Sequence, residues 1–298
     1  MWSGLLTECA VQRQVDLWLA EDTPPLDFAG ALLPRAEPAT AALFYKQSGR
    51  SVLCGAPLLD AVFRRFRCAA RWLYADGDSL ETTEKVARVK VAEVTGLASD
   101  ILLAERTALN VLCRTSGVAT LTRSCVERAS KCRWTGRVAA TRKTTPGFRL
   151  AEKYAVLVGG GDTHRYNLSS MVMLKDNHID ACGGDIAKAV RRARQRCGFS
   201  LKVEVESRNW EEAFEAASAG ADIVMLDNFE PTKAVEVASE LKARFPAITI
   251  EVSGGIDATN LSLYFAPNID VISMSCLTQG YPVCDFSLKL EKQPPSSD

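Results

Sequence analysis

The fold is decided by residues 201–227, LKVEVESRNWEEAFEAASAGADIVMLD. Two short apolar runs, 201–206 and 222–227, flank a segment whose apolar residues recur with the period of an amphipathic helix. Short apolar runs that alternate with helices are typical of parallel strands buried on both faces. The stretch therefore predicts a strand–helix–strand unit, and each of its strands ends in an acidic residue, Glu206 and Asp227.

The same alternation continues on both sides of this unit. The expected strands are 136–141, 171–175, 201–206, 222–227, 248–255 and 270–274, and the expected helices are 150–158, 186–196, 210–219, 232–244 and 258–265. So many consecutive units indicate an α/β barrel, or part of one. A doubly wound open sheet is the alternative.

The first hundred residues follow a different pattern, which indicates an α+β layer with an open, solvated sheet face. The expected helices are 11–21 and 56–66, and the expected strands are 39–47, 51–55, 68–74 and 85–96. A long helix over 99–129 follows, with Ser99 or Asp100 as its N-cap and an interruption at Ser116 and Gly117.

The end of the chain returns to the alternating pattern of a half-exposed strand. Residues 284–292, CDFSLKLEK, are expected to rejoin the first domain as a strand. We therefore expect an N-terminal α/β sandwich domain over 1–113, with 281–298 as its return segment, and an α/β barrel domain over 114–280.

The composition carries no global electrostatic bias. Lys and Arg number 36 and are balanced by 36 Asp and Glu, so a basic field for nucleic acid or an anionic membrane is absent. The ten cysteines form no CxxC pair, and we expect them to be reduced and mostly buried, which suggests the cytoplasm. Neither a secretory signal nor a membrane-spanning run is expected.

Charged or small residues follow the expected strands, where α/β barrels place their active sites. They are Arg142, Lys143, His164, Arg165, Lys175, Glu206, Asp227, the Ser253–Gly254–Gly255 turn and Ser275, with Glu204 on the same face as Glu206. Each of these alone is most simply read as a solvated loop residue, an ordinary turn or a strand residue lining the barrel. Together they indicate one site, because strand after strand ends in the same kind of element.

The chemistry of these residues suits a multiply anionic ligand. Arginine holds carboxylates in bidentate fashion, lysine supplies a point charge, and a Ser-Gly-Gly turn lets backbone N–H groups approach a phosphate. A close pair of opposite charges contributes roughly 4 kcal/mol before desolvation reduces it. Glu206 and Asp227 are then left to bind ribose hydroxyls, to hold Mg²⁺, or to stabilise positive charge on a sugar.

At the level of motifs the chain resembles the quinolinate phosphoribosyltransferase family. The resemblance is carried by ERTALNVLCRTSGVAT (105–120), TRKTTPGFRLAEKYAV (141–156), GGGDTHRYNLSSMVMLKDNH (159–178), KVEVE (202–206), ADIVMLDNF (221–229) and EVSGGI (251–256). It implies a sandwich domain followed by an incomplete barrel of about seven strands. It also implies transfer of phosphoribose from phosphoribosyl pyrophosphate to quinolinate with Mg²⁺, giving nicotinate mononucleotide, pyrophosphate and CO₂ in NAD biosynthesis.

The resemblance assigns roles to individual residues. It implies quinolinate binding by Arg106, Arg142, Lys143, Thr144, His164, Arg165 and Lys175. It implies phosphoribosyl pyrophosphate binding by Lys143, Lys175, Glu206, Asp227, Ser253, Gly254, Gly255 and Ser275. Lys143, Glu206 and Asp227 are expected to be catalytic, and Glu206 and Asp227 are expected to bind the metal.

The family also implies an assembly. The arginine at position 106 comes from a neighbouring subunit, so a homodimer is the minimal active unit and a homohexamer is expected. Ser275 departs from the glycine usual in the family, which leaves its contact with phosphate open.

Two other functions compete with this one. The first is a barrel lyase in which Lys175 forms a Schiff base with a phosphosugar, and the second is a non-catalytic binding protein. The sequence leaves open the order of substrate binding, the kinetic separation of transfer from decarboxylation, and any regulatory role of a cysteine.

Overall fold

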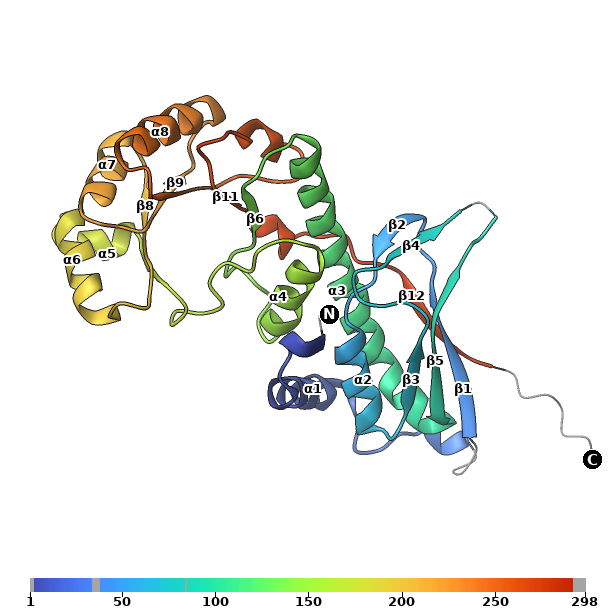
Figure 1. The fold of residues 1–298 in the computed structure, drawn as a ribbon. Helices are drawn as coiled ribbons and strands as arrows, with labels where there is room; N and C mark the ends of the chain where they lie inside the picture. The colour runs from blue at the N-terminus through green and yellow to red at the C-terminus, as the bar shows by residue number, and fades with distance from the viewer. Residues whose placement is uncertain (1–2, 34–37, 84, 292–298) are drawn as a thin grey trace, which may run out of the picture. The chain divides into compact units, whose positions relative to one another are not determined.

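The computed structural model describes residues 3–33, 38–83 and 85–291, and the chain forms two compact units (Figure 1). The first unit comprises residues 1–121, 145–159 and 281–298, and the second comprises 122–144 and 160–280. The division falls inside the longest helix, α3 (Ala98–Lys131).

An antiparallel sheet in the order β12-β1-β5-β3 organises the first unit. Its strands are β1 (Pro38–Tyr45), β3 (Ala69–Trp72), β5 (Val89–Leu97) and β12 (Phe286–Leu290), and a separate ribbon pairs β2 (Gly49–Val52) with β4 (Ser79–Thr82). Strand β12 pairs with β1 from Ala41–Leu290 to Tyr45–Phe286. The predicted return of the chain end is thus confirmed.

Helices share an apolar core with this sheet. They are α1 (Glu8–Asp22), α2 (Ala56–Arg65), the first part of α3, and α4 (Arg149–Val158), with short 3-10 turns at Ser3–Leu5 and Gly30–Leu32. In α2, Leu59 and Val62 are fully buried whereas Arg64 and Arg65 are exposed, as its helical period predicts. Helix α4 belongs to this unit although its place in the alternating pattern suggested a barrel helix.

Helix α3 corrects two expectations. It starts at Ala98, before both predicted N-caps, and it continues through Ser116 and Gly117 without interruption. The Ser116 hydroxyl accepts a hydrogen bond from Cys54 N at 3.1 Å, and a Cβ on Gly117 would lie 2.2 Å from the Pro282 carbonyl oxygen. The two small residues therefore permit close packing, and that packing overrides their low helix propensity.

A six-stranded parallel sheet in the order β6-β11-β10-β9-β8-β7 forms the second unit. Its strands are β6 (Arg137–Ala139), β7 (Val172–Leu174), β8 (Val203–Ser207), β9 (Ile223–Asp227), β10 (Thr249–Ser253) and β11 (Val271–Ser273). Beyond β6, a single parallel bridge joins Ala139 to Asp162. The strands do not close, so the predicted incomplete α/β barrel is confirmed.

The outer side of the barrel strands carries helices (Figure 1). They are α5 (Asp176–Asp180), α6 (Ile186–Cys197), α7 (Trp210–Ser218) and α8 (Pro231–Arg244). The helix expected over 258–265 is only a 3-10 turn, Leu261–Tyr264, and a second such turn spans Ser275–Leu277.

Two predictions about the whole chain have mixed outcomes. All ten cysteines lie in the described ranges and are free thiols, but only Cys54, Cys68, Cys125 and Cys284 are buried. Within the residues that the model describes, no helix combines the length and apolarity needed to cross a bilayer.

Candidate active site

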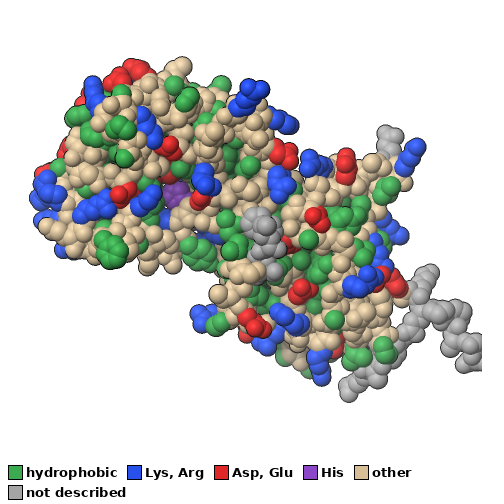
Figure 2. Space-filling model, viewed as in Figure 1, with side chains coloured by type: hydrophobic (Ala, Val, Ile, Leu, Met, Phe, Trp, Pro, Cys, Tyr) green, Lys and Arg blue, Asp and Glu red, His purple; other side chains and the backbone are tan. Residues whose placement is uncertain are grey.

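A cavity of about 460 Å³ opens in the second unit at the carboxyl ends of the barrel strands. Its walls come from alternate strand positions, because side chains separated by two residues point to the same face. Its lining residues are Thr141, Arg142, Lys143, His164, Arg165, Met173, Lys175, Glu206, Met225, Asp227, Asn228, Glu251, Ser253, Gly254, Gly255 and Ser273. Figure 2 shows a histidine at the surface among Lys, Arg and acidic side chains.

The loop after β6 supplies two of the cations. Lys143 N donates to the hydroxyl of Thr141 at 3.0 Å, and the Lys143 carbonyl accepts from the Thr278 hydroxyl at 2.7 Å. These bonds fix the main chain, while the Lys143 side chain stays exposed and Arg142 is half-buried. The loop thus presents one exposed and one partly desolvated cation to the cavity.

The His164–Arg165 pair supplies a third cation beside the bridge at Asp162. His164 has a φ of +54°, and its N–H donates to Asp162 Oδ1 at 2.7 Å. The Arg165 side chain is buried, with Nη2 3.1 Å from Met173 Sδ. Burial, and then the charge of Arg142, lowers the pKa of the Arg165 guanidinium. A guanidinium remains charged in proteins, so an anionic ligand would be favoured here.

Two acidic residues, Glu206 and Asp227, line the same cavity. Glu206 forms an ion pair with Lys175, and Asp227 Oδ2 accepts from Asn228 Nδ2 at 2.8 Å. Both carboxylates are half-buried. Such oxygen donors suit ribose hydroxyls or a hard cation such as Mg²⁺.

The turn after β10 is built for close approach of a ligand to the backbone. Gly254 has a φ of +96°, and a Cβ there would lie 2.3 Å from Asn228 Oδ1. Gly255 has a φ of +63° with no heavy atom near its Cβ position. Beside them the hydroxyls of Ser253 and Ser273 lie 2.9 Å apart. Exposed N–H groups in such a turn are typical of phosphate sites.

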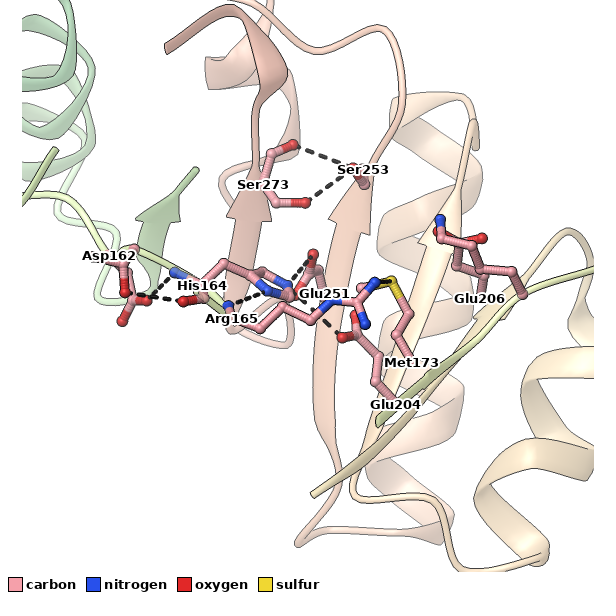
Figure 3. Close-up of polar contacts among 11 residues, drawn as sticks. Asp162, His164, Arg165, Met173, Glu204, Glu206, Glu251, Ser253 and Ser273 are labelled. Carbon is pink, nitrogen blue, oxygen red and sulfur yellow. Dashed lines mark hydrogen bonds and ion pairs between the residues drawn. The ribbon is translucent and has the colours of Figure 1, made fainter. Parts of the chain in front are cut away.

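Two buried carboxylates lie next to His164 (Figure 3). Glu251 is 1% exposed, and its two oxygens lie 3.0 and 3.2 Å from His164 Nε2. Glu204 is fully buried, with its nearer oxygen 3.7 Å from the same nitrogen. Burial, and then the charge of Glu251, raises the pKa of Glu204 well above its ordinary value. The cluster therefore favours the protonated form of one carboxyl.

Most residues that the sequence predicted for the site line this one cavity. Thr144 and Ser275 are not among its lining residues. Ser275 starts a 3-10 turn, and the Thr144 hydroxyl donates to the Arg142 carbonyl. Arg106 is exposed on α3 in the first unit. The lining residues that were not predicted for the site are Thr141, Met173, Met225, Asn228, Glu251 and Ser273. Glu251 could have been found from its place two residues before Ser253.

The fold and the cavity define a class of protein: an α/β-barrel enzyme whose site combines arginines suited to carboxylates, a turn suited to phosphate and acidic residues suited to a sugar. Comparison with known proteins agrees with this class. The family models "Quinolinate phosphoribosyl transferase, C-terminal domain" and "N-terminal domain" match residues 118–289 and 27–116. The chain belongs to the quinolinate phosphoribosyltransferase family.

Relatives extend the similarity over the whole chain. The nicotinate-nucleotide pyrophosphorylase [carboxylating] of Homo sapiens is 51% identical over 286 residues, covering 96% of this chain and 93% of that protein. The enzyme of the same name from Dictyostelium discoideum is 46% identical and covers 98% and 99%. The solved structure of the nicotinate-nucleotide pyrophosphorylase from Francisella tularensis is 35% identical in sequence, with a TM-score of 0.86, and covers 96% of this chain and 98% of that chain.

Proposed function

We propose that the chain transfers phosphoribose from phosphoribosyl pyrophosphate to quinolinate and releases CO₂, giving nicotinate mononucleotide for NAD biosynthesis. The observation that supports this most is that one cavity brings two kinds of group together. Arg142 and Arg165 suit two carboxylates, while Glu206, Asp227 and the Gly254 turn suit a phosphorylated sugar.

The transfer step needs charge stabilisation more than covalent chemistry. The pyridine nitrogen attacks ribose C1, and pyrophosphate leaves with the electron pair of the broken C–O bond. Lys143 offsets negative charge on the departing pyrophosphate, and Glu206 and Asp227 stabilise the positive charge that develops on the ribose. Lys175 and the two arginines hold the carboxylates, so that the ring nitrogen stays aligned with C1.

Decarboxylation follows from the product of transfer. The bond between ring carbon 2 and its carboxylate breaks, CO₂ leaves, and the electron pair stays on carbon 2 beside the positive nitrogen. A solvent proton then bonds to that pair and forms the C–H bond of the product. The pyridinium is its own electron sink, so we propose no organic cofactor. Bound Mg²⁺ would neutralise part of the pyrophosphate charge. Glu206 and Asp227 would hold the Mg²⁺ through their carboxylate oxygens.

We also propose a homodimer as the minimal active unit, with a homohexamer as the expected assembly and the cytoplasm as its location. The residue that motivates the dimer is Arg106, which is exposed on α3. In this proposal it reaches the quinolinate of a neighbouring subunit, as the family motif 105–120 implies.

The lyase alternative is disfavoured by the surroundings of Lys175. A lysine that forms a Schiff base with a phosphosugar gives no role to Arg142 and Arg165, which line the same cavity as Lys175. No particular observation favours a non-catalytic binding protein, because the cavity is lined by both cations and carboxylates in reach of one ligand.

The test is release of labelled CO₂ from carboxyl-labelled quinolinate with phosphoribosyl pyrophosphate and Mg²⁺, together with detection of nicotinate mononucleotide. Nicotinate replaces quinolinate in a parallel reaction, and it should be a poor acceptor because it leaves one carboxylate-binding group unused. Failure to release CO₂, or equal use of nicotinate, would contradict the proposal.

A further inference from the structure

Both ring nitrogens of His164 are already occupied within the protein. The main-chain N–H of Arg165 donates to Nδ1 at 2.7 Å, and the two carboxylate oxygens of Glu251 lie 3.0 and 3.2 Å from Nε2 (Figure 3). A donor facing Nδ1 and acceptors facing Nε2 fit the neutral tautomer that carries its proton on Nε2. A ring held in this way has no nitrogen left to bind a substrate carboxylate.

The main chain around His164 is held as firmly as its ring. A φ of +54° is uncommon for a residue other than glycine. It is enforced here by Asp162 Oδ1, which accepts from His164 N at 2.7 Å, and by the Thr163 hydroxyl, which donates to the His164 carbonyl at 2.9 Å. Unusual backbone of this kind persists where the surrounding contacts over-determine it, and such places cluster at functional sites.

We propose that Glu251 is a positioning residue for quinolinate and that it acts through His164 on Arg165. The proposal rests on the carboxylate-binding role of Arg165. Glu251 contacts Nε2 and holds the imidazole ring in place. Nδ1 of that ring accepts the main-chain N–H of Arg165 and so positions the Arg165 main chain. Arg165 itself is only 9% exposed, so its side chain has little freedom to move independently. The His164 ring is therefore a support for Arg165 and not itself a ligand of the substrate.

The same three side chains could be read as a metal site, since ligand atoms of His164, Glu204 and Glu251 lie within 4.8 Å of one another. The histidine geometry argues against that reading. A neutral imidazole that binds metal through Nε2 carries its proton on Nδ1, but Nδ1 here faces the N–H of Arg165.

The charges around the cluster also balance without a metal ion. The charged groups that act on Glu204 are Glu251, Arg165, Glu206 and Lys175, and Arg142 acts on Arg165 in turn. Burial raises the pKa of Glu204, so the neutral form of this carboxyl is favoured. The negative charge of Glu251 is then offset by the positive charge of Arg165.

The tautomer can be measured directly, because the chain has only two histidines, His164 and His178. In the full chain labelled with ¹⁵N-histidine, nitrogen chemical shifts report which ring nitrogen is protonated, and His178→Gln assigns the two rings. We expect a neutral His164 with its proton on Nε2 at pH 7, unchanged when Zn²⁺ or Mn²⁺ is added. A proton on Nδ1, a doubly protonated ring, or a metal-dependent shift of the His164 signals would overturn the proposal.

The functional consequence is tested by Glu251→Gln, which keeps the size of the side chain and removes its charge. We expect KM for quinolinate to rise about tenfold, the usual effect of weakening one charge-assisted hydrogen bond. KM for phosphoribosyl pyrophosphate should change less than twofold, because the phosphate-binding turn is not part of this chain of contacts. Glu236→Gln is the matched control, since Glu236 forms an exposed ion pair with Lys233 at 3.0 Å on α8.

The outcomes separate this inference from the function on which it rests. An unsubstituted enzyme that releases no CO₂ contradicts the proposed reaction, whereas an active enzyme whose Glu251→Gln variant keeps its KM for quinolinate overturns only the role of Glu251. An equal rise in both KM values would also overturn it, because that pattern indicates general damage to the barrel. The tautomer measurement uses the unsubstituted chain, so it stands even if the variant does not fold.

Discussion

Substitution of Gly254 by alanine is expected to damage the phosphate-binding turn more than the same change at Gly255. At Gly254 the φ of +96° lies outside the left-handed region open to other residues, and the new Cβ would lie 2.3 Å from Asn228 Oδ1 and 2.8 Å from Asn228 N. The backbone conformation alone costs about 1–3 kcal/mol. Relief of the contact displaces Asn228, whose N–H donates to the Ser253 carbonyl at 2.9 Å, and loss of that bond costs about 1 kcal/mol more.

Gly255→Ala is the matched control. Its φ of +63° lies in the left-handed region, its Cβ position meets no atom within 4 Å, and the expected cost is about 1–2 kcal/mol. Urea unfolding of the full chain should show the larger loss of stability for Gly254→Ala, and steady-state kinetics should show a raised KM for phosphoribosyl pyrophosphate with little change for quinolinate. Equal stability of the two variants would refute the steric argument.

Three further predictions follow from the charges of the site. Glu204→Gln should raise the free energy of unfolding above that of the unsubstituted chain, and the difference should grow as pH rises above about 4.5. The reason is that a carboxyl whose pKa is raised by folding contributes stability that is lost as pH rises. Urea unfolding at several pH values measures the difference between the two free energies, and a difference that does not change with pH would contradict the prediction. Lys143→Ala should lower kcat by about 10²–10³-fold, and near-normal turnover would show that the lysine is misassigned. Equal mixtures of Arg106→Ala and Lys143→Ala subunits should recover up to about a quarter of full activity if Arg106 of one subunit completes the site of its partner, because half of the dimers are mixed and each has one intact site. Equal mixtures of Arg142→Ala and Lys143→Ala subunits should recover no activity, because both residues belong to the same subunit's site.

The fold could be predicted from sequence wherever the spacing of apolar residues kept the period of a strand or helix over the whole element. The unit over 201–227 alternates cleanly, and its strands and helix lie where the pattern places them. The pattern failed where tertiary packing decides. Ser116 and Gly117 read as a break in isolation, yet the contacts of Cys54 and Pro282 require small residues at that point of a continuous helix.

The site was predictable to the extent that its residues follow strands. Arg142, Lys175, Glu206 and Asp227 all meet in one cavity because parallel strands bring their carboxyl ends to one edge. Glu251 was missed because it lies inside a strand, between Ile250 and Val252, where a lone acidic residue gives no sign of its partner. Only the three-dimensional structure pairs it with His164, which is 87 residues away in sequence.

Arg165 and Lys175 differ in how they are held, and the difference bears on how a ligand is bound. Arg165 is only 9% exposed, its main-chain N–H donates to His164 Nδ1, and its Nη2 lies 3.1 Å from Met173 Sδ, so its guanidinium is held in place before binding. Lys175 is balanced at the open edge by Glu206, where its side chain remains 42% exposed. An anion can replace Glu206 as the partner of Lys175 at low cost, because a partly exposed ion pair contributes little stability. In the proposed reaction, that exchange would free Glu206 to bind the ribose when a quinolinate carboxylate binds Lys175.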